Sequence, residues 1–381
     1  MSFFYQHAWS LAGFFGVVLV IFLSNLWALG RLKESSSATG AKVSVLVPMR
    51  DEEGNAEECV RALLAQDHEH YEVLVYEEGS QDRTPQILAS IKDSRLRVLQ
   101  GDGPPPGWLG KAWACQNLAQ HASGELLLFV DADVRLSGGA VSAAVAALAK
   151  GRLDLLSVLP RQEVGTLGET LVVPLISWSL SSFFPFAVGK IWPRAGLAAA
   201  VGQFLLFRRE AYAALGGHEV VRSEVLEDVV LARKATQRGL RVGLVYGGSL
   251  VRCRMYTGLR GAVRGFAKSL FPVFGRRTLF FLFVWNWLLY ATWQPPLLLV
   301  SLSTGWSSLP QEFLAPAAWA SGVAFALWLL TTVRFRFPWY LPFIYPVVVG
   351  AGWTVAMRSL LWHVVGWGTW KGRSIHTKEE R

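Results

Sequence analysis

ELLLFVDADVR, at residues 125–135, is the stretch from which the fold can be read. Its apolar run at residues 126–130 predicts a central strand that is covered on both faces. The run ends abruptly at Asp131 and Asp133. Open α/β sheets bind ligands at the carboxyl ends of their strands, and hard cations such as Mg²⁺ or Mn²⁺ take oxygen ligands that they share with substrate phosphates. A solvated turn at the strand end is the plainer alternative.

The segments before this strand alternate between apolar runs and helical patterns. Strands are expected at residues 43–47, 71–76 and 96–99, and a helix at residues 55–66. Such alternation predicts a largely parallel sheet with helices on both sides. The first helix is not opened by Gly-x-Gly-x-x-Gly, and the sequence has no Walker motif, so a dinucleotide-type site is not expected. A nucleotide bound through a metal and acidic residues is compatible with this pattern.

Two polar loops follow these strands. EEGSQDRT, at residues 77–84, can reach a base or a ribose, or can cap the next helix through Ser80 or Asp82. The loop at residues 103–111 is stiffened by three prolines and ends where a helix begins, at Lys111. A cation at a helix start opposes the helix dipole, so a nearby anion would explain Lys111. An ordinary surface lysine is the alternative.

EVLEDVVLAR, at residues 224–233, has a helical pattern. Glu227 and Asp228 are adjacent in it, so they are expected to point in different directions, with only one of them directed into a cleft. The alternative is an exposed helix start with acidic residues in its first turn, which the helix dipole favours.

The chain is unusually apolar. It is 52% hydrophobic with 17 Trp, and its mean hydropathy is +0.32. Residues 9–29 form an apolar run of the roughly 20 residues that a bilayer requires. Arg31 and Lys33 follow it and nothing basic precedes it, which predicts an uncleaved anchor with the next domain in the cytoplasm. A cleaved signal peptide ending near residues 28–30 is the alternative.

A second apolar block lies in the carboxyl-terminal part. Spans are expected at residues 279–302 and 316–333, and residues 339–367 form either a span or a re-entrant hairpin. A basic tail favours a cytoplasmic end, and a hairpin would keep the number of crossings consistent. The aromatic and proline-rich residues 170–202 are interpreted as an interfacial helix pair at headgroup level. A buried segment of the domain is the alternative.

The net charge of +9 comes from residues that flank the apolar segments. Anionic lipid heads or a nucleotide diphosphate explain it better than nucleic acid, because no basic stripe is interleaved with aromatic residues. Residues 256–274 carry Arg260, Arg264 and Lys268 at helical spacing, which suits a phospholipid anchor or a contact with a leaving diphosphate. The three cysteines have no metal-ligand spacing and are read as reduced thiols.

Together these segments resemble the membrane-bound family 2 glycosyltransferases, whose catalytic domain has the GT-A fold. The resemblance covers most of residues 42–271. It looks closest to the bacterial carotenoid-type and hopanoid-associated branch, through Trp-x-Gly-Lys-Ala and the tail at residues 370–373, and ceramide glucosyltransferases are more distant. The matching motifs, in order, are Val47-Pro48 with Glu52-Glu53, Glu77-Glu78-Gly79-Ser80 with Asp82 and Thr84, Trp108-Leu109-Gly110-Lys111-Ala112, Asp131-Ala132-Asp133, Gly202-Gln203, Gly216-Gly217-His218 and Glu227-Asp228.

The resemblance implies a role for each matching residue. Asp228 would be the general base, and Asp133 with Asp131 would hold Mn²⁺ or Mg²⁺ on the diphosphate. The nucleotide-sugar would lie along Pro48, Glu52, Glu77, Glu78, Asp82, Lys111 and Asp131. The acceptor and diphosphate side would include Gln203, His218, Glu227, Arg264 and Lys268.

Two features depart from the family pattern. Glu77-Glu78 stands where Asp-Asp is usual, so the distance to the base can differ. The Gln/Arg-x-x-Arg-Trp box of processive synthases is absent, and RGFAK at residues 264–268 occupies that region. The second departure weakens an assignment to polymer synthesis.

The sequence therefore predicts an α/β protein: a Rossmann-like, mostly parallel GT-A domain with one amino-terminal and several carboxyl-terminal transmembrane helices. It is placed in the inner membrane with its catalytic domain in the cytoplasm. The expected divisions are an anchor at 1–30, a linker at 31–41, the catalytic domain at 42–270 with the interfacial segment 170–202, a transmembrane region at 271–370 and a basic cytoplasmic tail at 371–381.

The expected activity is an inverting transfer of a single sugar from a nucleotide-sugar, UDP-linked, to a membrane lipid such as a carotenoid, hopanoid, diacylglycerol or ceramide-like acceptor. A carboxylate must take the proton of the acceptor hydroxyl, and cations stabilise the leaving diphosphate. A processive polysaccharide synthase is one alternative. A catalytically inactive, nucleotide-binding membrane scaffold is another. No nucleic acid partner is expected.

Overall fold

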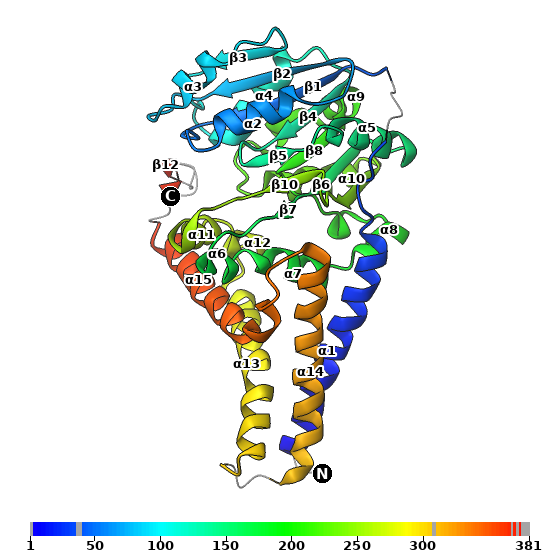
Figure 1. Cartoon of the computed structure of the whole chain (residues 1–381), viewed down its shortest axis with the longest axis vertical. Helices are drawn as coiled ribbons and strands as arrows, with labels where there is room; N and C mark the ends of the chain where they lie inside the picture. The colour runs from blue at the N-terminus through cyan, green and yellow to red at the C-terminus, as the bar shows by residue number, and fades with distance from the viewer. Residues whose placement is uncertain (1–2, 36–39, 307–309, 367–368, 371–372, 375–381) are drawn as a thin grey trace. The chain divides into compact units, whose positions relative to one another are not determined.

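The computed structural model describes residues 3–35, 40–306, 310–366, 369–370 and 373–374 (Figure 1). The chain forms two compact units. The helical unit comprises Met1–Ala28, Val164–Ala187 and Tyr256–Val365, and the sheet unit comprises Leu29–Glu163, Val188–Met255 and the end of the chain. The predicted basic tail at 371–381, apart from Arg373 and Ser374, and residues 36–39 of the predicted linker lie outside the described residues.

A seven-stranded sheet forms the centre of the sheet unit, in the order β3-β2-β1-β4-β8-β6-β9. Strands β1 to β4 run parallel to one another, β6 runs parallel to β9, and β8 is antiparallel to β4 and β6. The mostly parallel sheet predicted from the sequence is confirmed. The strands are β1 Val43–Met49, β2 Tyr71–Glu77, β3 Leu96–Gln100, β4 Leu126–Val130, β6 Leu155–Leu159, β8 Phe204–Arg208 and β9 Val242–Tyr246.

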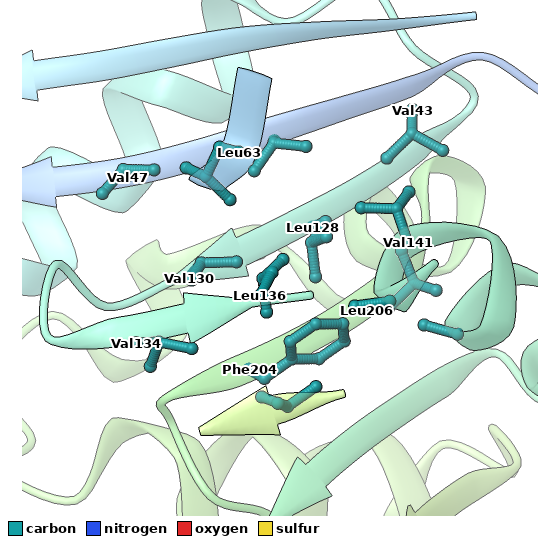
Figure 2. Close-up of a cluster of buried hydrophobic side chains, with 14 of the residues drawn as sticks. Val43, Val47, Leu63, Leu128, Val130, Val134, Leu136, Val141, Phe204 and Leu206 are labelled. Carbon is teal, nitrogen blue, oxygen red and sulfur yellow. The ribbon is translucent and has the colours of Figure 1, made fainter. Parts of the chain in front are cut away.

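The central strand β4 is buried along its whole length. Alternate side chains separate into two hydrophobic clusters, one on each face of the sheet. Figure 2 shows the first cluster, in which Leu128 and Val130 of β4 lie beside Phe204 of β8 and below Leu63. Leu127 belongs to the second cluster. The expectation of a strand covered on both faces is therefore confirmed.

Helices cover both faces of the sheet. Leu63 of α2 and Val141 of α5 belong to the first cluster, and Leu118 of α4 and Leu231 of α10 to the second. The predicted helix at residues 55–66 is observed slightly shorter, as α2. The helices of this unit are α2 Ala56–Leu64, α3 Thr84–Ser90, α4 Gly110–His121, α5 Ala140–Lys150, α9 Arg209–Leu215 and α10 Glu227–Gln237, with 3-10 turns η1 Ala195–Leu197 and η2 Gly217–Val221.

A second, three-stranded sheet lies directly beyond the end of β4. Its order is β5 (Val134–Leu136), β10 (Val251–Cys253) and β7 (Arg161–Gln162). The chain leaves the large sheet at Val130 and enters the small one at Val134. The Asp-Ala-Asp segment is therefore the connection between two sheets, which fixes both of its ends.

The helical unit contains the long apolar helices. Among the described residues, the stretches Tyr5–Ala28, Gln311–Phe335 and Tyr345–Val365 are long and apolar enough to cross a membrane. The helices of this unit are α1 Phe3–Ala28, α6 Leu167–Thr170, α7 Pro174–Phe183, α11 Gly258–Ala267, α12 Leu270–Val273, α13 Thr278–Ser303, α14 Leu314–Phe335 and α15 Tyr345–Val365, with 3-10 turns η3 Gln311–Phe313 and η4 Leu341–Phe343; α8 Phe186–Ile191 joins the units, and β11 Thr369–Trp370 pairs with β12 Arg373–Ser374.

One membrane expectation is wrong, and another stays a prediction. Residues 345–365 form one continuous helix, so the hairpin alternative for residues 339–367 is wrong. The predicted span at residues 279–302 is a 26-residue helix, α13, with Pro295 and Pro296 inside it. It is not among the candidate spans found in the described part of the chain, because polar residues and these prolines interrupt its apolar run.

The predicted interfacial pair at residues 170–202 stays a prediction, and its segment has both buried and exposed aromatic side chains, such as Trp192 at 64% exposed. Helix α7 packs inside the helical unit, where Trp178 is 4% exposed and stacks on Trp328 of α14 at 4.9 Å. The buried Asn25 of α1 donates to the carbonyls of Ser181 and Phe184 at 2.8 and 2.6 Å. Within α7, Trp178 is therefore buried against a neighbouring helix, whereas Phe183 is 38% exposed. Residues 164–187 and 256–270 of the predicted catalytic range accordingly belong to the helical unit.

Candidate active site

The carboxyl ends of β1, β2 and β4 meet at one edge of the large sheet, because these strands run parallel in register. Pro48 lies near the end of β1, beyond the last residue that pairs with β4. Glu77 ends β2, and Asp131 follows β4.

The loops after β1 and β2 are clamped to each other. Ser80 Oγ accepts from Asp51 N–H at 2.9 Å, and Asp51 Oδ1 accepts from Gln81 N–H at 2.8 Å. Asp82 Oδ2 accepts from Glu53 N–H at 2.9 Å. Since each loop satisfies the backbone donors of the other, the two form one rigid rim at the sheet edge.

Asp82 also binds the start of a helix, although the N-cap residue of α3 is Arg83 and not Asp82 as one interpretation of its loop expected. Its Oδ1 accepts from Thr84 N–H at 2.9 Å, at the first residue of α3. Glu77 Oε1 accepts from Ser80 N–H at 2.6 Å, and both Glu77 and Glu78 are buried. These carboxylates shape the rim from within, and their contact with a nucleotide stays a prediction.

Lys111, the second residue of α4, lies between two carboxylates. Its Nζ is 2.8 Å from Asp131 Oδ1 and 2.8 Å from Glu227 Oε1. Burial alone would lower the pKa of Lys111, but Asp131 and Glu227 raise it well above its usual value, so the ammonium keeps its charge. The anion that a lysine at a helix start requires is therefore supplied by the protein's own acids.

Glu227 and Asp228 both converge on Gly202. A Cβ at Gly202 would lie 3.0 Å from Lys111 Nζ, 3.2 Å from Asp228 Oδ2 and 3.2 Å from Glu227 Oε1. Gly202 N–H donates to Asp228 Oδ2 at 2.6 Å. The expectation that only one of the two acids points into a cleft is wrong. They are the first two residues of α10, where side chains project from the helix end, so the helical wheel does not separate them.

Asp228 is held in the state of a weak acid. Burial, and next the charge of Glu227, raise the pKa of Asp228 to about 6. Lys111 opposes this shift, as do the N–H groups of Val229 and Gly202. A carboxylate with a pKa near 6 is ionised at neutral pH and is also basic enough to accept a proton, which is the combination that a general base needs.

One carboxylate oxygen of Asp133, Oδ1, is buried without a hydrogen bond. Burial, and next the charges of Asp131 and Glu52, raise the pKa of Asp133 to about 7. Repulsion among carboxylates at this point would be relieved by a divalent cation.

The donor set fits such a cation when it is shared with a phosphate ligand. No group of three or more His, Cys, Asp or Glu in the described residues forms a complete protein metal site. Mg²⁺ usually takes one or two carboxylates and completes its shell with water and substrate phosphates. Asp131 and Asp133 provide that number of carboxylates, so the residues present fit Mn²⁺ or Mg²⁺.

Gln203 and His218 lie behind the carboxylates rather than in front of them. The carbonyl of Gln203 accepts from Asp131 N–H at 3.3 Å. His218 is 1% exposed, its Nδ1 lies 2.8 Å from Tyr212 Oη and its ring packs on Phe129 at 4.8 Å. Burial, and next the charge of Lys111, lower the pKa of His218 to about 3, so it stays neutral. His218 is a neutral residue of the core near Lys111, and its contact with an acceptor stays a prediction.

Two residues in the predicted acceptor set belong to the other unit. Arg264 lies on α11 and Lys268 directly follows it, both in the helical unit. Their contact with a leaving diphosphate stays a prediction. Cys253 was not predicted as part of the site, although it lies next to Asp133. Its pairing depends on β10, far along the chain, and no local pattern could reveal it.

Comparison with known proteins agrees with this geometry. Residues 44–216 match the family described as glycosyl transferase family 2. A 4,4'-diaponeurosporenoate glycosyltransferase from Staphylococcus haemolyticus is 26% identical over 244 residues, which cover 62% of this chain and 63% of the relative. The protein of the same name from Staphylococcus aureus is 27% identical over 234 residues, covering 60% of each chain. The chain thus matches less than two thirds of the length of these relatives.

A solved structure shows the same fold. The mannosyltransferase PcManGT from Pyrobaculum calidifontis, in complex with GDP-Man and Mn²⁺, superposes with a TM-score of 0.51 at 18% sequence identity. The superposition covers 94% of this chain and 99% of the mannosyltransferase. The GT-A fold predicted from the sequence is confirmed.

Proposed function

Because this chain carries a glycosyltransferase family 2 domain at residues 44–216, we propose that it moves a single sugar, with inversion, from a nucleotide-sugar to a membrane lipid. The observation that carries the proposal is the convergence of Lys111, Asp131, Glu227 and Asp228 at the carboxyl end of β4. One base and one charge-neutralising cation are the parts that a direct displacement requires.

The donor is assigned to the rim formed by the loops after β1 and β2. A rim whose backbone donors are already satisfied is pre-organised, which lowers the cost of binding. In this proposal the donor is a UDP-sugar. It contacts the rim at Pro48, Glu52, Glu77, Glu78 and Asp82. A hydrolysis assay with a panel of UDP- and GDP-sugars tests which nucleotide base is recognised, since only the correct donor should be consumed.

The diphosphate is assigned to Asp131, Asp133 and Lys111. Asp131 and Asp133 would hold Mn²⁺ or Mg²⁺, and such an ion neutralises charge on a departing diphosphate. Lys111 already lies between two acids, and its fixed charge stabilises the negative charge that develops on the leaving group.

Asp228 is proposed as the base. It takes the proton of the acceptor hydroxyl while the oxygen attacks the anomeric carbon, the bond from that carbon to the diphosphate breaks, and the nucleoside diphosphate leaves with the bonding electrons. One displacement from the face opposite the leaving group inverts the anomeric configuration. The anomeric proton coupling of the product, measured by NMR, tests this step.

The pKa of Asp228 predicts a pH dependence. The base acts in its ionised form, so kcat/KM is expected to fall about tenfold per pH unit below about 6. The pH dependence of kcat/KM reports the pKa of Asp228 in the free enzyme, which burial and next the charge of Glu227 raise. Replacing Glu227 by Gln removes a raising charge, so the acidic limb should move to lower pH. A limb that stays in place in Glu227→Gln contradicts the assignment to Asp228.

The acceptor is proposed to be a long-chain lipid alcohol or acid. The similar staphylococcal proteins are named for a 4,4'-diaponeurosporenoate, and the described part of this chain has three candidate membrane-crossing helices. We place it in the inner membrane as a multi-pass protein with the sheet unit in the cytoplasm, where nucleotide-sugars are available. Protease protection of the sheet unit in inverted and right-side-out vesicles checks that orientation.

The number of sugars added separates this function from polymer synthesis. We expect the purified protein in liposomes to add one sugar to a lipid acceptor and stop, as the processive box is absent. Mass spectrometry of the lipid products shows the count directly. A ladder of multiply glycosylated products would favour a processive synthase, and a protein that binds donor but never consumes it would be an inactive scaffold.

A further inference from the structure

Behind Asp133, three buried polar side chains form a hydrogen-bonded row. Cys253 is the register partner of Val134, the residue after Asp133, on the antiparallel strands β10 and β5, and its thiol interacts with the Asp133 carboxylate. Gln203 Nε2 donates to Cys253 Sγ at 2.8 Å, and Gln162 Nε2 donates to Gln203 Oε1 at 2.8 Å. Gln162 and Cys253 are register partners on the parallel strands β7 and β10. We call Gln162, Gln203 and Cys253 the polar row.

The polar row is shielded from water. Cys253 is fully buried, and Gln162 and Gln203 are 2% and 6% exposed. Cys253 also belongs to the first hydrophobic cluster, which is shown in Figure 2. Burying an amide costs free energy unless its hydrogen bonds are made inside the protein, so apolar residues would serve packing better here. The hydrogen bonds of this row therefore point to a purpose other than packing.

Gln203 supports both acids of the Asp-Ala-Asp segment. Its backbone carbonyl accepts from the N–H of Asp131 at 3.3 Å, and its side chain reaches Asp133 through Cys253. Gln203, which directly precedes β8, thus contacts this segment at both of its acids. Without these contacts, the distance between the carboxylates of Asp131 and Asp133 would depend only on the packing of neighbouring residues.

We propose that Cys253 and Gln203 are positioning residues that orient the carboxylate of Asp133 toward a divalent cation. This inference rests on the proposed function, in which Asp133 is a metal ligand. The thiol engages the carboxylate, while Oδ1 is left without a hydrogen-bond partner. Groups behind a metal ligand fix its orientation and commonly change metal affinity about 10- to 100-fold when they are removed.

Another cysteine provides a matched control. Cys59 on α2 is fully buried and belongs to the same hydrophobic cluster as Cys253. It lies near enough to Asp133 to be affected by its charge, but the hydrogen bond to Asp133 comes from Cys253. Replacing either cysteine by Ala removes one buried sulfur, so the two variants lose similar packing and differ in the hydrogen bond.

The test compares UDP binding with and without Mn²⁺ in full-length wild type, Cys253→Ala and Cys59→Ala, by titration calorimetry in detergent. Cys253→Ala is expected to weaken the Mn²⁺-dependent affinity for UDP about 10-fold or more and to leave the metal-free affinity unchanged. Cys59→Ala should keep the wild-type response to Mn²⁺, even though both variants unfold at lower temperature.

Two further variants guard against a folding defect. Cys253→Ser retains a donor to Asp133 and should recover part of the response to Mn²⁺. Gln203→Met has a similar length but cannot donate to Cys253, so it should weaken the response in the same direction. Equal responses to Mn²⁺ in Cys253→Ala and Cys59→Ala would overturn the inference alone. A wild type whose UDP affinity ignores Mn²⁺ would overturn the proposed function and this inference with it.

Discussion

Replacing Asp228 by Asn is expected to lower the rate of sugar transfer at least about 100-fold, the lower end of what a positioned base contributes. The amide has nearly the volume of the carboxylate and can still accept the hydrogen bond that Gly202 N–H donates to Asp228 Oδ2. It cannot accept the proton of the acceptor. Donor affinity should change little, and steady-state kinetics with separate donor titration measures both quantities.

Two neighbouring acids serve as comparisons for Asp228→Asn. Glu224 is exposed and lies before α10, so Glu224→Gln should retain wild-type turnover. Glu227→Gln breaks the ion pair with Lys111 and should mainly affect the donor side. Near-normal turnover in Asp228→Asn, combined with a large loss in Glu227→Gln, would transfer the role of base to Glu227.

Replacing Asp133 by Ala is expected to abolish the part of donor binding that depends on Mn²⁺. A cation held by two carboxylates and a diphosphate loses one of very few protein ligands. Without metal the result should have the opposite sign, because the variant removes a negative charge from beside Asp131. Calorimetric titration of UDP, once with Mn²⁺ and once with EDTA, measures the metal-dependent and the metal-free affinity separately. Unchanged Mn²⁺-dependent affinity would show that Asp133 is not a ligand.

The same variant should stabilise the metal-free protein at pH 8. The pKa of Asp133 is raised to about 7 in the folded protein, by burial first, from an ordinary value of 3.8. The unfolded chain therefore loses this proton at lower pH, and the contribution of Asp133 to stability falls as the pH rises from about 4 through 7. Asp133→Ala removes that loss. Thermal unfolding at pH 5 and pH 8 should show a gain at pH 8 relative to pH 5.

Some features of this protein were determined by its sequence alone, because they depend on neighbouring residues. A continuous apolar run that stops at two aspartates predicts a central strand with acids at its end, and β4 with its Asp-Ala-Asp connection has that form. The strands at residues 43–49 and 71–77 and the helical start near Lys111 follow from similar local patterns. The apolar helix at the amino terminus is long enough to be recognised by length and composition.

Tertiary structure decided which of these residues meet. Lys111 and Glu227 are far apart in the sequence, yet their side chains lie 2.8 Å apart since α4 and α10 both begin at the site. The shared direction of Glu227 and Asp228 depends on their place at the helix end, which a helical wheel ignores. Trp178 was expected at a membrane surface and is buried, because Trp328 of α14 provides a stacking partner.

The polar row shows most clearly that local sequence does not reveal which distant residues meet. Its three members come from segments around residues 162, 203 and 253, and only the pairing of β7 with β10 brings them behind Asp133. Local sequence specifies where strands, helices and charged turns occur, because those depend on residues within a few positions. The environment of each carboxylate depends on contacts across the whole fold, and the roles of Asp133 and Asp228 follow from those contacts.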